Sequence, residues 1–382
     1  MTRENIKIIL NNWESFKGSF PHTLAPFSKR NWGSPLHSVC SYQGKMKPAL
    51  AYHLIKTFTR EGDIVLDPFS GSGTIPFEAS LNGRIGLGLD IGELATSLSN
   101  AKLMEHNEGE IRKIISQLEN FISNNEPSSK SQEDTREIGF NKTIPDYFHP
   151  QTLKEIQLAR DFFSIKHPES GSWSLVFSCM LHILHGNRPY ALSRTSHPIT
   201  PYAPTGEFIY KSVIEKLTDK VNRSLNVQRG ELFSQGHCYQ ADILSEWPQE
   251  IKNVNAIITS PPFFDSTKFY MANWMRYWFC GWGKADFQEN PKSFVETLQK
   301  STFEIYDRIF EQCSNRLVDN GIAVFHLGHS AKCNMAEELL PYSNKYFNHI
   351  DTFTESVEHC ESHGIKDKGS VKGHQYLVLI KK

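Results

Sequence analysis

The stretch Asp63-Ile64-Val65-Leu66-Asp67-Pro68-Phe69-Ser70-Gly71-Ser72-Gly73-Thr74 decides the fold of this chain of 382 residues. An apolar run leads directly into a glycine-rich turn, which is typical of a buried parallel strand that feeds a loop at its carboxyl end. A second segment has the same form, because Ala256-Ile257-Ile258 precedes Thr259-Ser260-Pro261-Pro262-Phe263. In open α/β sheets, ligands bind at this edge. We therefore expect an α/β fold with a mainly parallel, doubly wound sheet and a ligand site where these two strands end.

The rest of the chain divides into three parts. Strands and helices alternate in residues 1–105 and again in 236–382, whereas 106–235 is largely helical and is predicted to be an insertion. The predicted helices span residues 48–58, 93–104, 150–163, 173–185, 207–226, 270–279 and 294–317, and further strands span 84–89, 322–327 and 376–380. Residues 119–137 are rich in Asn, Ser, Lys, Gln and Glu, which predicts an exposed linker.

Composition excludes several classes of protein. The seven cysteines are scattered without a CxxC pair, which favours reduced thiols and a cytoplasmic protein over a disulfide scaffold or a zinc ribbon. There is no apolar signal core at the N-terminus and no run long enough to span a membrane, so we expect a soluble protein without a membrane partner. Two histidine-containing groups could bind a metal, but packed or surface histidines explain them better and we expect no metal; they are His182 with His185, and His359-Cys360-Glu361-Ser362-His363.

The glycine-rich turn favours a ligand that carries a ribose. Gly71 and Gly73 allow the backbone to approach a ligand closely and present the first amides of the following helix to polar groups. Asp90, at the end of the next strand, is placed to accept hydrogen bonds from ribose hydroxyls. The alternative is a tight turn followed by an aspartate that caps a helix. Neither a Walker loop nor a complete GxGxxG dinucleotide motif is present.

The stretch from Gln43 to Asp90 resembles the S-adenosylmethionine-binding half of the amino-methyltransferases that act on DNA. That family carries an Asp-Pro-Phe-x-Gly-x-Gly-Thr loop, which matches residues 67–74, after a helix start that contains Lys-Met-Pro. Here Lys45-Met46-Lys47-Pro48 differs by one inserted residue, Lys47. The resemblance implies a Rossmann-like class I methyltransferase with S-adenosylmethionine as cofactor. It also implies a set of cofactor-binding residues: Lys45, Asp67, Pro68, Phe69, Gly71, Ser72, Gly73, Thr74, Asp90 and Asp242.

The Ser260-Pro261-Pro262-Phe263 segment suits chemistry on an aromatic amine. The lone pair of such an amine is delocalised into the ring, and hydrogen-bond acceptors directed at the NH2 group localise it on nitrogen. Consecutive prolines hold the backbone rigid without an N–H, so a neighbouring carbonyl can act as that acceptor, and the Ser260 hydroxyl can act as another. Phe263 offers a flat face on which a base can stack. An ordinary turn after a strand is the alternative explanation.

This segment resembles the Ser-Pro-Pro-Tyr/Phe signature of DNA cytosine-N4 methyltransferases, whereas adenine-N6 enzymes more often carry Asp-Pro-Pro or Asn-Pro-Pro. The resemblance implies catalytic roles for Ser260, Pro261, Pro262 and Phe263, and it leaves adenine open. Methylation of cytosine C5 requires a cysteine nucleophile in a Pro-Cys loop, and none of the seven cysteines follows a proline. The aromatic residues Trp274 and Trp278 either help to form the base pocket, as the resemblance implies, or form a buried helix face.

The insertion is the predicted region of target recognition in double-stranded DNA. Between His182 and Gly230, seven basic side chains stand against three acidic ones, although the whole chain is nearly neutral, with 41 basic and 42 acidic residues. The predicted DNA contacts are Asn187, Arg188, Arg194 and Lys268, in loops that also contain His197 and Tyr202. The resemblance further implies a restriction-modification or related defence role, with a cognate restriction endonuclease as a partner. Two rival functions stay open: methylation of an RNA amine, as on a tRNA guanine, and nucleic-acid binding without catalysis.

Overall fold

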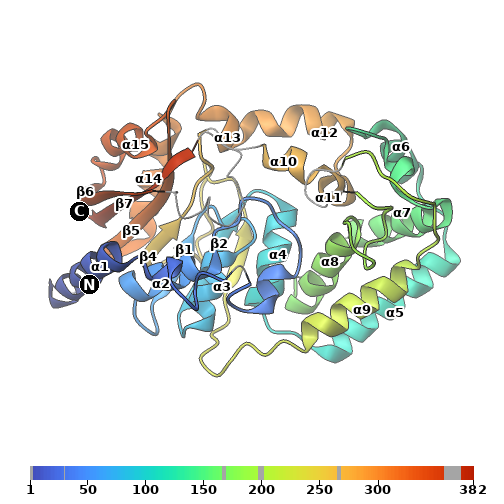
Figure 1. Ribbon diagram of the computed structural model, residues 1–382, viewed down its shortest axis with the longest axis horizontal. Helices are drawn as coiled ribbons and strands as arrows, with labels where there is room; N and C mark the ends of the chain where they lie inside the picture. The colour runs from blue at the N-terminus through green and yellow to red at the C-terminus, as the bar shows by residue number, and fades with distance from the viewer. Residues whose placement is uncertain (1–2, 30, 166–168, 197–201, 265–267, 357–370) are drawn as a thin grey trace.

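A seven-stranded sheet forms the centre of the computed structural model (Figure 1), which describes residues 3–29, 31–165, 169–196, 202–264, 268–356 and 371–382. The order of its strands is β3-β2-β1-β4-β5-β7-β6. Six strands run parallel to one another, and β7 is antiparallel to its neighbours β5 and β6. The strands are β1 Ile64–Asp67, β2 Ile85–Asp90, β3 His237–Gln240, β4 Val254–Thr259, β5 Leu317–Ser330, β6 Phe347–Ser356 and β7 Val371–Lys381. The predicted α/β class with a mainly parallel sheet is confirmed.

Helices cover both faces of the sheet, because successive residues of each strand point to opposite sides. Val65 and Ile258 pack with α1, α2 and α3 on one face, while Leu66 and Ile257 belong to the cluster that contains α14 and α15 on the other. The helices of these two layers are α1 Arg3–Ser19, α2 Pro48–Phe58, α3 Thr74–Leu81, α14 Ile305–Arg316 and α15 Met335–Ser343. The sheet is therefore doubly wound, as predicted.

The direction in which successive strands are added to the sheet reverses between β1 and β4. From β1 the strand order runs outward through β2 to β3, and from β4 it runs the other way to β5. A topological switch point of this kind opens a crevice at the carboxyl ends of the strands. The two segments singled out in the sequence follow β1 and β4, and so they flank this point.

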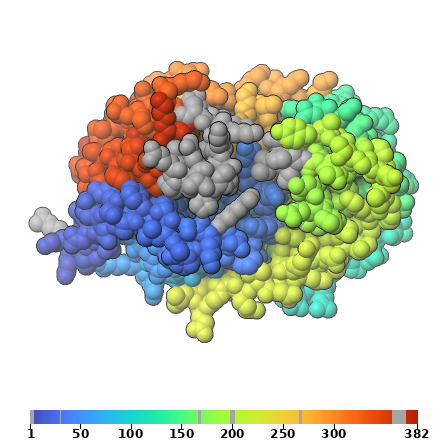
Figure 2. All heavy atoms as spheres, viewed as in Figure 1, coloured from blue at the N-terminus to red at the C-terminus, as the bar shows by residue number. Residues whose placement is uncertain are grey.

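The insertion forms a helical lobe beside the sheet. Figure 2 shows the residues of the insertion, green to yellow-green, gathered on the side of the molecule away from the red C-terminal residues. They pack against α4 in a cluster that also includes aromatic residues of α11. The helices within residues 106–235 are α5 Glu108–Asn124, α6 Ser129–Glu137, α7 Pro150–Ser164, α8 Gly171–Ile183 and α9 Val213–Leu225. Helix α4 Glu93–Leu103 precedes them, and α10 Phe269–Ala272, α11 Trp274–Phe279, α12 Lys284–Glu289 and α13 Val295–Leu298 follow β4. The division at residues 105 and 235 stays a prediction.

The predicted linker at residues 119–137 is wrong. Residues up to Asn124 complete α5, and Ser129–Glu137 forms α6, whose N-cap Ser128 accepts a hydrogen bond from the Ser131 amide at 3.1 Å. Asp134 of α6 is buried and pairs with the buried Arg160 of α7 at 2.5 Å. This ion pair fixes a helix that carries almost no apolar side chain, so hydrophobic periodicity could not reveal it.

Two predicted helices are interrupted. The region 270–279 is divided into α10 and α11 at Asn273, and the region 294–317 is divided into α13 and α14 by residues 299–304. At the second break, Gln299 is the C-cap of α13, and its side chain donates to the Pro262 carbonyl in the loop after β4. Trp274 and Trp278 are 1% and 0% exposed, so they form the buried helix face rather than an open pocket wall.

Candidate active site

The loops after β1 and β4 are tied together at the switch point. Thr259, the last residue of β4, donates a hydrogen bond from its hydroxyl to Oδ1 of Asp67, the last residue of β1, at 2.6 Å. The Phe69 amide donates to the same oxygen at 3.1 Å. Asp67 is only 3% exposed, and burial raises its pKa to about 7. The two segments predicted to hold cofactor and substrate therefore begin side by side.

The glycine loop adopts a conformation that other residues rarely take. Gly71 and Gly73 have φ angles of +49° and +71°, in the left-handed region that favours glycine. Gly73 is the N-cap of α3 and provides no side-chain cap, so the first amides of α3 are available to a ligand. A Cβ atom on Gly73 would lie 2.9 Å from the Ser99 Cα atom of α4, so the close packing of loop and helix also requires glycine.

Asp90 connects the end of β2 to the glycine loop. Its Oδ2 accepts a hydrogen bond from the Gly71 amide at 2.9 Å, and its Oδ1 accepts one from the Gly92 amide at 2.9 Å. Burial raises the pKa of this carboxyl to about 6, although the amide hydrogen bonds favour the charged form. Since each carboxylate oxygen has two lone pairs, the group can also accept bonds from a ribose. Gly92 is the N-cap of α4, so Asp90 supports the start of this helix as well.

Buried polar groups support the glycine loop from behind. The Ser72 carbonyl accepts a hydrogen bond from Lys102 of α4, a lysine 1% exposed whose pKa is lowered by burial to about 7. The Ser72 hydroxyl lies 3.4 Å from that of Thr74, and both residues are buried. Pro68 is buried too, and Phe69 packs on the core between β1 and α14. These contacts hold the loop in a fixed shape.

Asp242 and Lys45, which were also predicted to bind the cofactor, make different contacts. Asp242 follows β3, and the preceding residue, Ala241, donates its amide to the Asp90 carbonyl at 2.9 Å. Its carboxylate accepts from the Leu244 amide at 2.9 Å, so Asp242 sits at the same edge of the sheet. Lys45 instead donates from Nζ to the His37 carbonyl at 2.7 Å. Its proposed contact with the cofactor stays a prediction.

The loop after β4 is held by residues that the sequence did not single out. Ser260 Oγ lies 3.1 Å from Nδ1 of His326, a residue of β5 that is 6% exposed. Burial lowers the pKa of His326 well below its ordinary value, so the imidazole is neutral. The Pro262 carbonyl accepts from Gln299 Nε2 at 3.0 Å, and Tyr306 donates to the oxygen of the same amide at 2.9 Å. The one sequence signal for this residue was a histidine within the mainly apolar run from Ile322 to Leu327 of β5.

Phe263 packs against β5. Its ring lies 5.6 Å from the ring of His326, and a Cβ atom on Gly328 would approach it to 2.7 Å. One face of the ring is thus supported by the strand next to β4. Pro261 is buried, which fixes the backbone between Ser260 and Pro262.

The predicted DNA contacts fall into two groups. Asn187, Arg188 and Lys268 are exposed, and the ammonium of Lys268 lies 5.9 Å from the centre of the Tyr270 ring. The guanidinium of Arg194 is occupied by contacts within the protein, because it donates to the carbonyls of Asp146 and Gly206. His197 lies outside the described residues.

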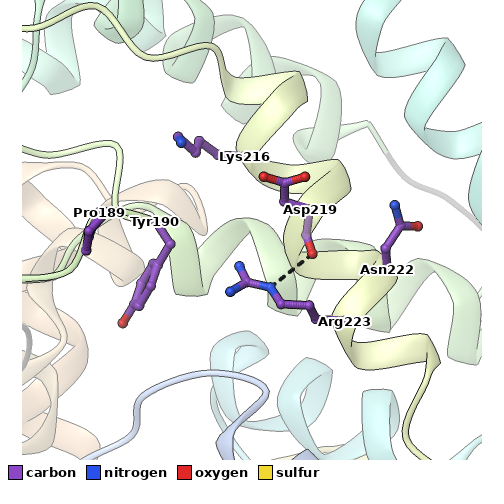
Figure 3. Close-up of a pocket in the computed structure, with 6 residues that line it drawn as sticks. All are labelled: Pro189, Tyr190, Lys216, Asp219, Asn222 and Arg223. Carbon is purple, nitrogen blue, oxygen red and sulfur yellow. Dashed lines mark hydrogen bonds between the residues drawn. The ribbon is translucent and has the colours of Figure 1, made fainter.

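A groove in the insertion lies next to Arg188. Figure 3 shows one face of α9 across from the loop after α8, and the hollow between them measures about 460 Å³. Tyr190 on the loop stacks on His182 with ring centres 4.6 Å apart. The lining residues are Pro189, Tyr190, Lys216, Asp219, Asn222 and Arg223. With two basic side chains against one acidic, and with Arg188 close to Tyr190, the groove carries a positive surplus.

The described part of the chain offers no group of three His, Cys, Asp or Glu side chains placed to hold a metal ion. His182 is engaged with Tyr190, and His185 lies 3.1 Å from the Ser193 hydroxyl. The His359-Cys360-Glu361-Ser362-His363 group lies outside the described residues. Among the helices described, none is long and apolar enough to cross a membrane. The predictions of no metal and of a cytoplasmic location stay predictions.

The sequence of residues 11–100 matches the family model described as DNA methylase, of the N6/N4 type. This range contains β1, the glycine loop and Asp90. The predicted resemblance to the N6/N4 DNA methylases is confirmed. The family implies S-adenosylmethionine as cofactor, and the doubly wound sheet with its glycine loop fits the Rossmann-like methyltransferase fold.

Two curated relatives extend the match. The type II methyltransferase M.MjaII of Methanocaldococcus jannaschii is 24% identical over 162 residues, which cover 40% of this chain and 31% of that protein. The type II methyltransferase M.HpaI of Haemophilus parainfluenzae is 28% identical over 162 residues, which cover 38% of this chain and 49% of that protein. This chain thus matches less than half the length of either relative. TrmN of Thermus thermophilus, a solved structure, aligns with 91% of this chain and 52% of its own at 13% identity and a TM-score of 0.38, a likeness that supports no further conclusion.

Proposed function

We propose that this protein is an S-adenosylmethionine-dependent DNA methyltransferase that acts on the exocyclic N4 amine of cytosine. The observation that carries the proposal is the 2.6 Å hydrogen bond between Thr259 and Asp67, which sets the Ser-Pro-Pro-Phe loop beside the glycine loop at the switch point of the sheet. A cofactor held by one loop would then face a base held by the other. Positioning of this kind provides most of the catalysis in a direct transfer.

The glycine loop and its neighbours suit the cofactor. The uncapped amides at the start of α3 would bind the polar methionine end, Asp90 would accept from the ribose, and Asp242 would lie toward the adenine. When bound, S-adenosylmethionine supplies a methyl group on a sulfonium centre that departs as a neutral thioether. The fit rests on groups that this chain already holds in fixed positions.

The Ser-Pro-Pro-Phe loop suits an amine as the acceptor of the methyl group. The Pro262 carbonyl is engaged by Gln299, which leaves the Ser260 and Pro261 carbonyls, and the Ser260 hydroxyl, to face a substrate. The neutral His326 would orient the hydroxyl by accepting a hydrogen bond from it at Nδ1, so that the Ser260 oxygen presents its lone pairs to the target N–H. The amine loses one proton when it gains the methyl group, and solvent or a weak base accepts it.

A base within a duplex cannot reach a loop at this depth. The target nucleotide would therefore leave the stack and enter the crevice, where Phe263 offers an aromatic ring supported by β5. The groove between α9 and the loop after α8, with Arg188, would bind the phosphate backbone of the flanking DNA. Arg194 is proposed to shape this loop, because its guanidinium is occupied by two carbonyls.

Cytosine is proposed over adenine because the first residue of the catalytic loop is serine. Both curated relatives are type II methyltransferases, which supports a place in a restriction-modification system with a cognate endonuclease. The N6 amine of adenine is the alternative target, and an RNA amine is the second.

The test is transfer of label from methyl-labelled S-adenosylmethionine. We expect label in duplex DNA and none in tRNA, and strongly reduced labelling of the DNA with the Ser260→Ala variant. Ser293→Ala serves as the matched control and should retain activity. The hydroxyl that it removes donates to the nearby Asn290 carbonyl. Label that appears only in tRNA would overturn the proposed substrate.

A further inference from the structure

Glu296 is a buried acidic side chain with an unused oxygen. It belongs to α13 and is 7% exposed. Its Oε2 accepts a hydrogen bond from the Phe269 amide at 3.4 Å, whereas its Oε1 is buried and has no hydrogen-bond partner among the described residues. Burial is the main cause that raises the pKa of this carboxyl, and the charges of Lys300 and Lys268 oppose it without forming an ion pair. A buried carboxylate without a partner is costly, so a donor is missing.

Glu296 lies between the two loops of the proposed active site. On one side, Gln299 is three residues further along and binds the Pro262 carbonyl of the catalytic loop at 3.0 Å; side chains three residues apart on a helical turn are neighbours. On the other side, the ring of Phe269 stacks on Tyr42, and Tyr42 lies 3.4 Å from the position of a Cβ atom on Gly71. The free oxygen therefore sits where the glycine loop and the catalytic loop approach each other.

Glu296 and Asp90 both lie near the same pair of tyrosines, Tyr42 and Tyr277. Both carboxyls contribute to raising the pKa of Tyr42 and of Tyr277, so each lies close to both rings. Asp90 is assigned to the ribose, which places the far end of the cofactor toward Glu296 and the catalytic loop. That end carries two positive centres, the sulfonium and the α-ammonium. Only the ammonium has N–H groups that can donate to the unused oxygen.

We propose that Glu296 binds the α-ammonium group of S-adenosylmethionine through its buried Oε1. This inference rests on the proposed function, since it assigns a residue to the same cofactor. The contact would neutralise the buried carboxylate, satisfy its free oxygen and fix the methionine end while the ribose is held at Asp90. Glu296 would thereby set the direction in which the methyl group faces the catalytic loop.

The test compares three ligands in calorimetric titrations without DNA. S-Adenosylmethionine carries the sulfonium and the ammonium, S-adenosylhomocysteine carries only the ammonium, and methylthioadenosine carries neither. We expect Glu296→Gln to weaken binding of the first two by about 10- to 100-fold, as for loss of a charged hydrogen bond. Binding of methylthioadenosine should stay within about twofold of wild type, which also shows that the variant is folded. The control is Glu289→Gln, an exposed residue that pairs with Lys292 at 2.7 Å, and it should change none of the three.

Several results would overturn the assignment. Equal loss for all three ligands would indicate a structural role, and loss confined to S-adenosylmethionine would point to the sulfonium instead. Unchanged binding of every ligand would remove Glu296 from the cofactor site, and would leave its free oxygen to the target base. Failure of the wild-type protein to bind S-adenosylmethionine would refute the proposed function itself, which is a different outcome from failure of the variant.

Discussion

The sheet edge and the helical insertion differ in how their predicted functional residues are held. At the sheet edge, the Gly71 amide donates a hydrogen bond to Asp90, and Asp67 accepts one from Thr259 of β4. In the insertion, Asn187 and Arg188 are exposed, and Arg194 is occupied by backbone carbonyls. A site built from backbone geometry can therefore be recognised in the sequence, whereas a site built from surface side chains cannot.

The largest expected effect comes from Gly73→Val. A side chain there meets the Ser99 backbone, and φ is +71°, so the loop must shift. Left-handed strain and overpacking together amount to about 4 kcal/mol, which corresponds to about a 1000-fold loss of affinity for S-adenosylmethionine in a calorimetric titration.

The matched control for this change is Gly62→Val. Gly62 also has positive φ, +85°, but a Cβ atom there meets nothing within 4 Å. It should lower thermal stability without changing the affinity. Equal losses of affinity from both variants would show that backbone strain alone, rather than the packing of loop on α4, explains the effect.

The catalytic loop is tested by Ser260→Ala. Loss of an oriented acceptor should lower kcat by about 100-fold, in the range found for single preorganised hydrogen-bond groups. The affinity for S-adenosylmethionine should stay unchanged, since the glycine loop is intact. His326→Ala should lower kcat in the same direction but less, because it removes only the group that orients the hydroxyl. A His326→Ala variant with wild-type kcat would contradict that role.

Asp90 makes cofactor binding depend on pH. The carboxyl is charged above its pKa of about 6 and becomes protonated as the pH falls through that value. Since the carboxylate is the better acceptor, protonation of Asp90 should lower the affinity for S-adenosylmethionine by about tenfold for each pH unit well below 6. Titrations between pH 5 and 8 measure this, and Asp90→Asn should remove the dependence. Tighter binding at pH 5 than at pH 7 would contradict this role of Asp90.

The insertion is expected to give the smallest and most graded effect. The double variant Lys216→Ala/Arg223→Ala should weaken duplex DNA binding several-fold, and the slope of log affinity against log salt should fall in magnitude by about 2. Fluorescence anisotropy at several salt concentrations measures both. Arg112→Ala/Lys113→Ala removes the same charge from the exposed face of α5 and should leave the slope unchanged. The same slope for the groove variant and wild type would move the DNA contacts elsewhere.

The sequence predicted the elements around the sheet edge because their patterns are local. The helix at 48–58 begins with a proline and has the bounds expected, and the strands before both loops end within one residue of the predicted positions. The glycine loop and Asp90, which local pattern had singled out, are joined by the hydrogen bond from the Gly71 amide. In contrast, α6 depends on the Asp134–Arg160 ion pair between residues 26 apart, and the partners of the catalytic loop, His326 and Gln299, come from distant segments. Such contacts exist only in the folded chain.

The most direct test of the account is the identity of the methylated nucleoside. Unmethylated duplex DNA incubated with the protein and deuteromethyl-labelled S-adenosylmethionine is digested to nucleosides and analysed by mass spectrometry. We predict that the labelled nucleoside is N4-methylcytosine. Labelled N6-methyladenine would contradict the choice of cytosine, and labelled 5-methylcytosine, or no labelled nucleoside from a protein that binds the cofactor, would contradict transfer to an exocyclic amine.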